Sequence, residues 1–337
     1  MKILYAIQGT GNGHITRATE IIPLLQEKGK LDILISGNDN NLDVGFDVKY
    51  NLKGLNFTFG KKGGIDFWQS FKKMKLVRFY KEIKKLPIED YDLIINDFEP
   101  ISAWAAKLNN VNIISLSHQN AVLDAASPKY GKYKFEKYIL KYYAPCNIRF
   151  GFHFKPYSSS TFTPIIRKKI RAKKISNKGH ITVYLPSYKV DEIVKILSKI
   201  PIVKWHIFSK DVKRLIFKKN VIIHPINEFD FIKSMSSSAG VLCGAGFETP
   251  SEALYLKKKL MVIPMKNQYE QQCNALALKE MGVSVIKKLN SRRIPKITKW
   301  ILSNTIIEVA YPDTTEEIIE AILLPYYHQT VLPTILS

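Results

Sequence analysis

The chain has little cysteine: three residues in 337, namely Cys146, Cys243 and Cys273, with no CxxC pair among them. Three cysteines far apart in the chain argue against a disulfide scaffold and favour a reducing compartment, so we expect a cytoplasmic protein. Long apolar runs are also absent, since none approaches the roughly 18–20 residues that span a bilayer. The apolar start, residues 1–7, is too short for a secretory signal and leads directly into a glycine loop.

The composition is otherwise that of a folded protein, but acidic residues are scarce. Hydrophobic residues make up 46% and charged residues 24% of the chain, which excludes the disordered and collagen-like classes. A length of 337 residues predicts about two domains. Lysine and arginine number 51 against 29 acidic residues, a net charge of +22. Such a field attracts nucleic acid, anionic lipid or phosphorylated ligands.

Strand and helix patterns alternate along most of the chain, beginning with an apolar strand, a glycine loop and a helical pattern in residues 2–27. Turn-forming residues and then seven basic residues within 167–178 interrupt this rhythm, and strands resume from residue 180. We therefore expect two α/β domains, each with a mostly parallel sheet covered on both faces. The expected boundaries are 1–150 for the first domain, 151–178 for a basic linker, 179–310 for the second domain and 311–337 for a helical tail that could cross back to the first domain.

The first candidate site follows the first strand. His14 stands where the dinucleotide fingerprint G-x-G-x-x-G has its third glycine, at the end of a loop formed by Gly9, Thr10, Gly11, Asn12 and Gly13. Such a loop turns tightly and leaves amides free to face a ligand at the start of the next helix. His14 would then lie at the carboxyl edge of the sheet, where open α/β sheets bind ligands. The alternative is a structural or phosphate-binding turn with an incidental histidine.

Asp97 ends another buried-type strand at the same edge of the sheet. An aspartate there can hold an imidazole in one tautomer and stabilise its protonated form, which suits His14 for work as a general base. Two alternatives stay open for Asp97: a cap of the helix that follows Pro100, or an Asx turn. Glu99 is a nearby substitute for the same role.

A second candidate site follows the strand at residues 241–243. Glycines and a hydroxyl at a helix start form a site for a diphosphate, and a carboxylate one turn later can accept hydrogen bonds from ribose. Carboxylate and amide groups in a later loop suit sugar hydroxyls. The residues concerned are Gly244, Ala245, Gly246, Phe247, Thr249 and Glu252, then Glu270, Gln271 and Asn274.

The segment from Gly244 to Asn274 resembles the donor-binding motif of GT-B glycosyltransferases, as found in plant-type UDP-glycosyltransferases and in the bacterial transferase that adds GlcNAc to the peptidoglycan lipid intermediate. The loop that ends at His14 is similar to the N-terminal glycine loop of that family. The resemblance implies a GT-B fold, two Rossmann-like doubly wound domains facing each other across a cleft. It also implies that His14 is the base with Asp97 in support, that Thr249 binds diphosphate and Glu252 ribose, and that Glu270 with Gln271 binds the sugar hydroxyls.

The sequence departs from the family pattern at three places. Gly244 replaces a phosphate-binding histidine, Glu248 replaces an asparagine, and lysines at 257–259 replace a Gly-x-Pro motif. Contacts to the diphosphate would then depend on backbone amides, Thr249 and Ser187. The Glu-x7-Glu pattern of retaining members is absent, because neither Tyr255 nor Leu256, at the end of that spacing from Glu248, is a glutamate. Inversion at the anomeric carbon is therefore the expected outcome.

A basic and aromatic stretch at residues 67–86 has two readings. Its apolar residues recur at near-helical spacing among seven lysines and arginines, so the helix could lie on an anionic membrane surface. The alternative is an ordinary amphipathic helix whose apolar face packs on the sheet.

We expect an inverting glycosyltransferase without metal or cofactor that takes a nucleotide sugar, UDP-linked, and a glycan or lipid-linked acceptor. It would work in the cytoplasm or at the inner face of the plasma membrane. The alternatives are a UDP-sugar epimerase or hydrolase on the same scaffold, and a nucleic-acid-binding protein suggested by the net charge alone. We expect no nucleic-acid partner, because no recognisable binding motif accompanies the charge.

Overall fold

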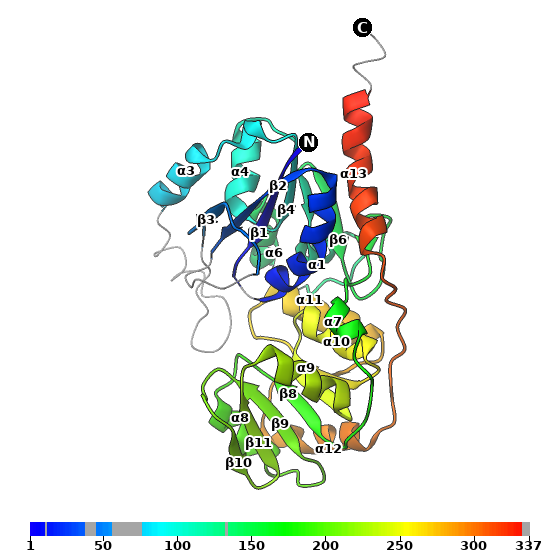
Figure 1. Ribbon diagram of the computed structural model, residues 1–337. Helices are drawn as coiled ribbons and strands as arrows, with labels where there is room; N and C mark the ends of the chain where they lie inside the picture. The colour runs from blue at the N-terminus through cyan, green and yellow to red at the C-terminus, as the bar shows by residue number, and fades with distance from the viewer. Residues whose placement is uncertain (11, 38–44, 56–75, 132–133, 332–337) are drawn as a thin grey trace.

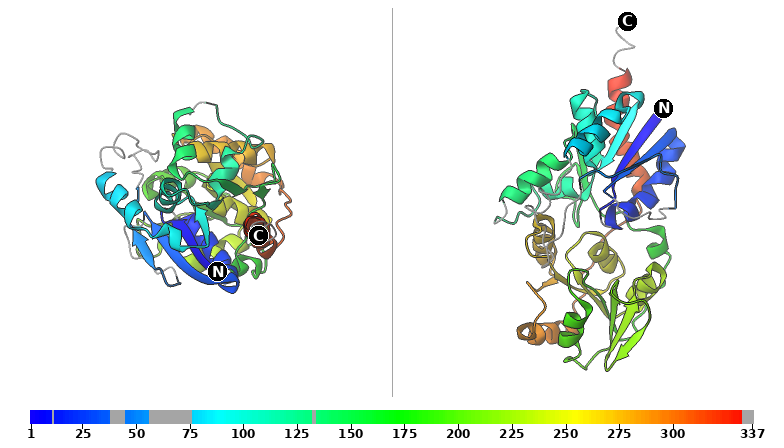
Figure 2. Two further views of the ribbon diagram at one scale, coloured as in Figure 1. Left: turned by 90° about the horizontal axis from the view of Figure 1, so that it is seen from above. Right: turned by 90° about the vertical axis from the view of Figure 1, so that its left-hand side faces the viewer.

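The computed structural model describes residues 1–10, 12–37, 45–55, 76–131 and 134–331. The polypeptide forms two bodies stacked one above the other, each built on a parallel sheet with helices on its faces (Figure 1). The right-hand view of Figure 2 shows the same division from the side. The doubly wound two-domain architecture expected from the sequence is thus confirmed.

The first sheet has seven described strands, all joined by parallel pairing in the order β3-β2-β1-β4-β5-β6-β7. Its central strands are apolar runs buried on both faces, as parallel sheets require. The strands are β1 (Lys2–Gln8), β2 (Lys30–Ser36), β3 (Tyr50–Leu52), β4 (Leu93–Asp97), β5 (Ile114–Leu116), β6 (Ile148–Phe152) and β7 (Thr161–Phe162).

Helices cover both faces of this sheet. One face carries α1 (Asn12–Lys28) and the C-terminal helix α13 (Thr315–Val331), which lie side by side in Figure 1. The other face is covered by α3 (Leu76–Lys85), α4 (Pro100–Leu108) and α6 (Lys134–Tyr143), which contribute to one apolar cluster with the strands. The short helix α5 (His118–Leu123) follows β5 at the carboxyl edge, and a 3-10 turn spans Ile88–Asp90.

The second sheet also has seven described strands, in the order β10-β11-β9-β8-β12-β13-β14, and only β10 pairs in the antiparallel sense. Its strands are β8 (Ile181–Tyr184), β9 (Trp205–Ser209), β10 (Ile216–Lys218), β11 (Val221–Pro225), β12 (Gly240–Gly244), β13 (Lys259–Ile263) and β14 (Ser284–Val285). The helices are α7 (Lys168–Arg171), α8 (Val190–Leu197), α9 (Glu228–Ser237), α10 (Glu248–Tyr255), α11 (Tyr269–Glu280) and α12 (Ile294–Leu302), with a 3-10 turn at Ser291–Arg293.

The first sheet runs further along the chain than the sequence indicated. We expected the first domain to end at residue 150, whereas β6 continues to Phe152 and β7 adds Thr161 and Phe162 to the same sheet. A strand of two residues, placed among serines and prolines, has too little periodicity to be recognised in a sequence. The expected linker 151–178 therefore contains the end of the first sheet and the short helix α7.

The chain returns to the first domain at its C-terminal end. Residues 303–314 run without regular structure away from α12, and α13 then packs against α1 (Figure 1). Ile318, Ile319, Ile322 and Leu323 are buried there in the cluster that also contains Ile21 and Leu25 of α1, and Lys28 forms an ion pair with Glu320. This one apolar cluster holds residues of both sheets, so the two domains share a continuous core.

Each sheet has a point at which its strand order reverses, and the carboxyl ends of its strands are directed toward the other domain. In the first sheet the reversal lies between β1 and β4, and in the second it lies between β8 and β12. A crevice opens outside the carboxyl ends of the strands at such a reversal, where doubly wound domains bind ligands. At the carboxyl ends of β1, β4 and β12 lie His14 in the first turn of α1, Asp97 as the last residue of β4, and Thr249 in the first turn of α10.

Candidate active site

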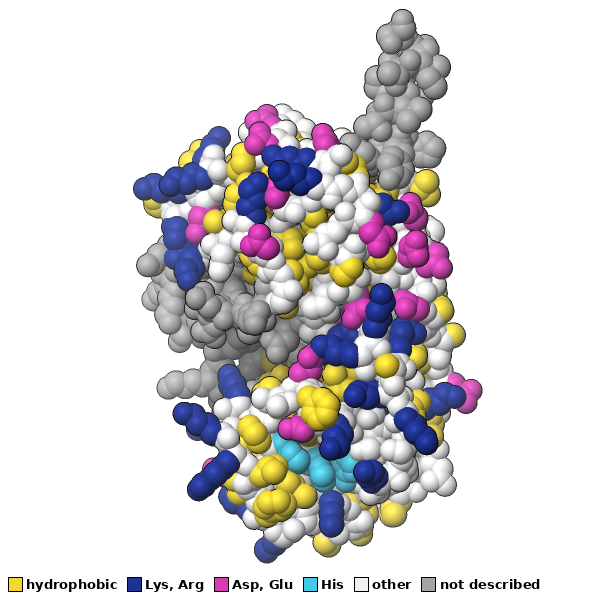
Figure 3. All heavy atoms as spheres, viewed as in Figure 1, with side chains coloured by type: hydrophobic (Ala, Val, Ile, Leu, Met, Phe, Trp, Pro, Cys, Tyr) yellow, Lys and Arg dark blue, Asp and Glu magenta, His cyan; other side chains and the backbone are white. Residues whose placement is uncertain are grey.

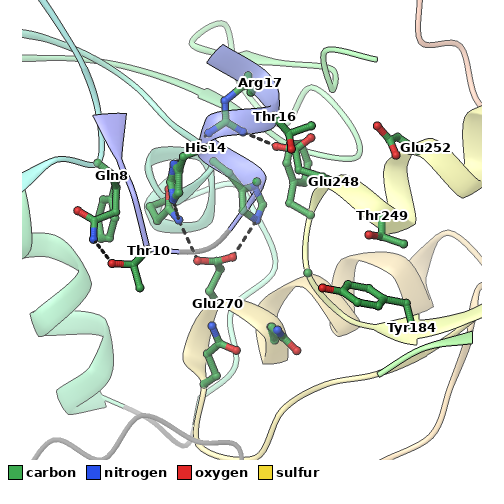
Figure 4. Close-up of a pocket in the computed structure, with 18 of the residues that line it drawn as sticks. Gln8, Thr10, His14, Thr16, Arg17, Tyr184, Glu248, Thr249, Glu252 and Glu270 are labelled. Atoms are coloured by element: carbon green, nitrogen blue, oxygen red, sulfur yellow. Dashed lines mark hydrogen bonds and ion pairs between the residues drawn. The ribbon is translucent and has the colours of Figure 1, made fainter. Parts of the chain in front are cut away.

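A cavity of about 460 Å³ lies between the two domains and is lined by residues of both. The first domain contributes the loops after β1, β4 and β5 together with α6, and the second contributes the starts of α9, α10 and α11 (Figure 4). Only tertiary structure joins these segments, which span residues 8 to 271.

His14 and Asp97 form a hydrogen-bonded pair at this cavity. The Nδ1 atom of His14, in the first turn of α1, lies 2.8 Å from Oδ1 of Asp97, the last residue of β4. The His14 side chain is 12% exposed at the cavity, whereas Asp97 is fully buried. Because Ile7 pairs with Asp97 across β1 and β4, the loop after β1 begins beside the carboxylate.

Glu99, and not Asp97, caps the helix that follows. Its side chain accepts hydrogen bonds from the amides of Ile101 and Ser102 at the start of α4. The capping role that the sequence left open for Asp97 is therefore wrong. Between the two acids Phe98 adopts a φ of 58°, a strained conformation for an aromatic residue, and its ring is stacked on His14 with centroids 6.4 Å apart.

Arg17 joins His14 and Asp97 in a group of three side chains, and the sequence analysis did not identify it. Its Nη2 donates to both oxygens of Asp97, at 2.8 and 2.7 Å, from a side chain that is 2% exposed. Burial alone would raise the pKa of Asp97, but the charges of Arg17 and His14 outweigh it and hold the pKa below its usual value. Asp97 is therefore a carboxylate at neutral pH. The missed signal is the helical spacing of three residues between His14 and Arg17.

Arg17 also reaches across the cavity to the second domain. Its Nη1 donates to Oε1 of Glu248 at 2.6 Å, and Glu248 is the first residue of α10. A Cβ on Gly13 would approach Cγ of Glu248 at 3.2 Å, so this glycine allows the two domains to meet closely. Burial raises the pKa of Glu248 to about 7, even though Arg17 acts in the opposite direction.

The glycine loop lines the cavity with Thr10 and Gly13. The amide of Gly9 donates to the carbonyl of Ser36 at 2.7 Å, which ties the loop to β2. Thr10 accepts a hydrogen bond of 2.6 Å from Nε2 of Gln8, another cavity residue (Figure 4). Gly11 lies outside the described residues, as does the side chain of Asn12.

The predicted donor residues divide into two groups. Gly246, Phe247, Thr249, Glu270 and Gln271 line the cavity, and the Cα of Gly246 faces open space. Glu252 lines it as well, whereas Gly244, Ala245, Ser187 and Asn274 are not among the residues that line it.

Glu252 lines the cavity but is already bound on both oxygens. Arg167 donates to it through Nε at 2.6 Å and through Nη2 at 2.9 Å, and both side chains are at least nine-tenths buried. Arg167 also pairs with Glu228 at the start of α9. The sequence placed Arg167 in a charge run of the linker, which concealed a partner 85 residues away.

Asn274 is a bridge between the domains. It is fully buried, its Nδ2 donates to the carbonyl of Ala245 at 3.2 Å, and its Oδ1 lies 2.9 Å from Nε2 of His118. His118 also stacks on Phe247 with ring centroids 4.0 Å apart. Asn274 thus joins the loop after β12 to α5, and its role in donor binding stays a prediction.

Two glutamines of the first domain present unpaired oxygens at the cavity. Gln119 donates through Nε2 to Glu270 at 3.0 Å and approaches Nε2 of His14 at 3.4 Å. The Oε1 atoms of Gln119 and Gln8 are buried and have no hydrogen-bond partner among the described residues. Buried amide oxygens of this kind are costly unless a ligand group or water donates to them.

An aromatic recess extends the cavity into the second domain. Phe231 packs on Tyr184 and on Phe208, with ring centroids 5.5 and 5.2 Å apart, and Asn227 lines the same part of the cavity. No motif marked these residues in the sequence, because they come from β8, β9 and α9 separately. Within the described part of the chain, no cluster of three or more His, Cys, Asp or Glu side chains could hold a metal ion.

Solved structures with the same architecture include several glycosyltransferases. MurG from Acinetobacter baumannii matches with a TM-score of 0.59 and 14% identity over 96% of this chain and 99% of that one. SnogD from Streptomyces nogalater has a TM-score of 0.55 at 11% identity, covering 96% and 99%. The spinosyn rhamnosyltransferase SpnG, complexed with thymidine diphosphate, has a TM-score of 0.55 at 11% identity and covers 100% of both chains. Comparison with curated protein sequences gives no match.

These neighbours and the two facing Rossmann-like sheets define a protein of the GT-B fold. The family model described as glycosyl transferase family 1 matches residues 1–301. The chain belongs to that family and is a glycosyltransferase. The family resemblance identified from the glycine loop and the Gly244–Asn274 segment is confirmed.

Proposed function

We propose that this glycosyltransferase moves a sugar, with inversion, from a nucleoside diphosphate sugar to an acceptor hydroxyl. The observation that carries the proposal is the 2.8 Å pair of His14 and Asp97 at a cavity that the donor-motif residues line from the other side. A general base on one face of the anomeric carbon and a diphosphate leaving group on the other is the arrangement that in-line displacement needs.

The hydrogen bonds around His14 indicate which nitrogen is the base. Asp97 is a carboxylate and only accepts, so Nδ1 of His14 carries the proton between them. Nε2 then holds a lone pair, and the nearby Nε2 of Gln119 can only donate toward it. The acceptor hydroxyl would lose its proton to Nε2 while its oxygen bonds to the anomeric carbon. The bond from that carbon to the phosphate oxygen breaks, and the nucleoside diphosphate leaves.

The donor would lie along the second domain. Free amides at the start of α10, with the Thr249 hydroxyl, suit the diphosphate, and Glu270 with Gln271 suits the sugar hydroxyls. The aromatic recess of Tyr184, Phe208 and Phe231 has the flat apolar walls that a nucleobase stacks on. We propose uracil as the base, and Glu252, held by Arg167, as the group nearest the ribose.

The acceptor would enter over the first domain, beside His14. Phe98 and Tyr143 offer two ring faces with centroids 4.9 Å apart, and the buried amide oxygens of Gln8 and Gln119 can accept hydrogen bonds. Rings combined with amide oxygens suit an acceptor that carries hydroxyls, so we propose a glycan or a lipid-linked sugar.

A thermal-shift screen followed by a product assay tests the proposal. Nucleoside diphosphates at about 100 times their dissociation constant stabilise a protein by about 2.7 kcal/mol, so UDP and UDP-sugars should raise the Tm. The same screen includes dTDP, because one structural neighbour is complexed with thymidine diphosphate. Sugar release or isomerisation without an acceptor would identify the epimerase or hydrolase alternative. If no nucleotide raised the Tm, the proposal would be wrong.

A further inference from the structure

The cavity that would bind a diphosphate has more acidic than basic side chains. Its described lining includes the glutamates Glu228, Glu248, Glu252 and Glu270 and the arginines Arg17 and Arg167. Arg167 is held by Glu252 through both oxygens and also pairs with Glu228. Arg17 donates to the first residue of α10 and so adjoins the start of that helix, where no side chain caps the amides.

Arg17 is bound at that place by a carboxylate. Oε1 of Glu248 accepts from Nη1 of Arg17 at 2.6 Å, and Glu248 is the first residue of α10. An anion there gains both from the guanidinium and from the amino-terminal end of a helix. The same two features would attract a phosphate of the donor, so the carboxylate and a phosphate compete for one position.

We propose that Glu248 holds Arg17 in place of a donor phosphate, and that a nucleoside diphosphate takes Arg17 over from Glu248 when it binds. The inference rests on the proposed function. It makes Arg17 a cation for the diphosphate and Glu248 an internal competitor. It also links donor binding to His14, because Arg17 holds Asp97 through its other nitrogen.

The exchange changes the protonation of Glu248. Its pKa is raised by burial to about 7, and the charged or titratable groups that act on it or face it are Tyr5, His14, Arg17, Asp97, Arg167 and Glu252. The loss of Arg17 as a partner and the arrival of a phosphate anion both favour the neutral carboxyl. Binding above pH 7 should therefore take up a proton at Glu248, and the affinity should fall as the pH rises.

Isothermal titration of UDP, dTDP and uridine into the full chain tests this at pH 6.0 and pH 8.5, each in two buffers of different ionisation enthalpy. Wild type should take up close to one proton per diphosphate at pH 8.5. Glu248→Gln should abolish this uptake and bind the diphosphates about tenfold tighter at pH 8.5. A change of this size is expected when one charge-assisted hydrogen bond no longer competes with the ligand. At pH 6.0 the difference should shrink, because wild-type Glu248 is then already neutral.

Three comparisons control for general charge and for folding. Glu270→Gln removes an equal charge from the same cavity without touching Arg17, and it should keep the proton uptake. Glu248→Asn should reproduce the effect of Glu248→Gln on a fold checked by circular dichroism. Uridine has no phosphates and should bind wild type and Glu248→Gln equally.

The outcomes separate the two proposals. If wild type binds diphosphates and both Glu248 variants show the same affinity and proton uptake as wild type, the competition is overturned. The proposed function is then unaffected. Equal effects of Glu270→Gln and Glu248→Gln overturn it as well, because a general charge effect then suffices. Failure of wild type to bind any nucleoside diphosphate overturns both.

Discussion

Asp97 accepts hydrogen bonds from His14 and from Arg17 at once, so its negative charge is shared between the two side chains. Arg17 takes both of its oxygens, so much of the carboxylate charge is compensated before His14 is considered. What Asp97 then gives His14 is chiefly orientation, with Nδ1 held as the donor and Nε2 facing the cavity. Arg17 in turn forms an ion pair with Glu248 of the other domain, so the geometry of the proposed base depends on how the domains meet.

We expect His14→Ala to lower kcat by about 10²–10⁴-fold, the usual contribution of a general base. The fold should be unchanged, because the side chain lies at the cavity surface and its loss leaves the Arg17–Asp97 pair intact. Turnover and circular dichroism measure both effects. Thr19→Ala is the matched control, since Thr19 is an exposed residue of the same helix. Turnover close to wild type in His14→Ala would exclude the base.

Glu252→Ala should lower both stability and donor affinity. Removal of the carboxylate leaves Arg167 buried with only the more exposed Glu228 as a partner, and an uncompensated buried charge costs about 3 kcal/mol or more. The Tm should fall by several degrees and the donor KM should rise. Lys169→Ala removes an exposed partner of Glu228 and should leave the Tm unchanged. A Glu252→Ala protein as stable as wild type would contradict the buried pair.

Among the elements, the strands of the second sheet carry a row of three histidines. His180 precedes β8, His206 lies on β9 and His224 on β11, with ring centroids 4.2 and 5.0 Å apart. Burial and the neighbouring histidines lower the pKa of His206 to about 4, and burial also lowers the pKa of the other two. The row is therefore neutral at pH 7.

Acid should consequently destabilise the second domain. An unfolded chain binds a proton at His206 below about pH 6.5, whereas the folded sheet resists it until about pH 4, so stability is lost as the pH falls through this window. Differential scanning calorimetry from pH 7.5 to 5.0 should show a falling Tm. His206→Asn removes the central titrating group and should flatten that slope. An equal slope in both proteins would show that the row does not control it.

At the scale of the whole molecule, positive charge covers both domains (Figure 3), but exposed apolar side chains accompany it on α3 and α6. Leu76, Val77 and Tyr80 of α3 are 50%, 72% and 55% exposed, and Tyr138 and Tyr142 of α6 are 59% and 52% exposed. Arg78 and Lys141 lie between them, and Phe79 and Leu140 pack in one apolar cluster that holds both helices. Residues 67–75 of the expected membrane helix lie outside the described part. Among the described residues, no helix is long and apolar enough to cross a membrane.

Ile83 and Leu86 are buried, which agrees with a helix whose apolar face packs on the domain. Because other apolar residues of the stretch are exposed, membrane binding remains a proposal. We expect the protein to sediment with anionic vesicles at low salt, since each basic residue near such a surface contributes about 1 kcal/mol within a Debye length. High salt or uncharged vesicles should release it. The double change Lys84→Glu and Lys85→Glu should weaken binding, whereas Lys218→Glu with Lys219→Glu on the other domain should not. Equal binding to both kinds of vesicle would favour a soluble acceptor.

The sequence by itself determined the central strands of each sheet and the segments that form the proposed site. A short, fully apolar run such as Leu93–Ile95 predicts a buried strand. Glycines next to a hydroxyl or a histidine at a helix start indicate a ligand-binding loop. His14, Asp97 and Thr249 were found in this way because each is marked by its immediate neighbours. The same local signals could not find β7, whose two residues have no period.

Only the tertiary structure decided which charges compensate one another. Arg17 and Glu248 are 231 residues apart, and Arg167 and Glu252 are 85 residues apart, so no spacing in the chain relates them. Likewise Asn274 fits a donor motif locally, yet its bonds go to His118 in the other domain. A buried charge is costly without a partner, and that partner is set by how the two sheets face each other, which no local pattern encodes.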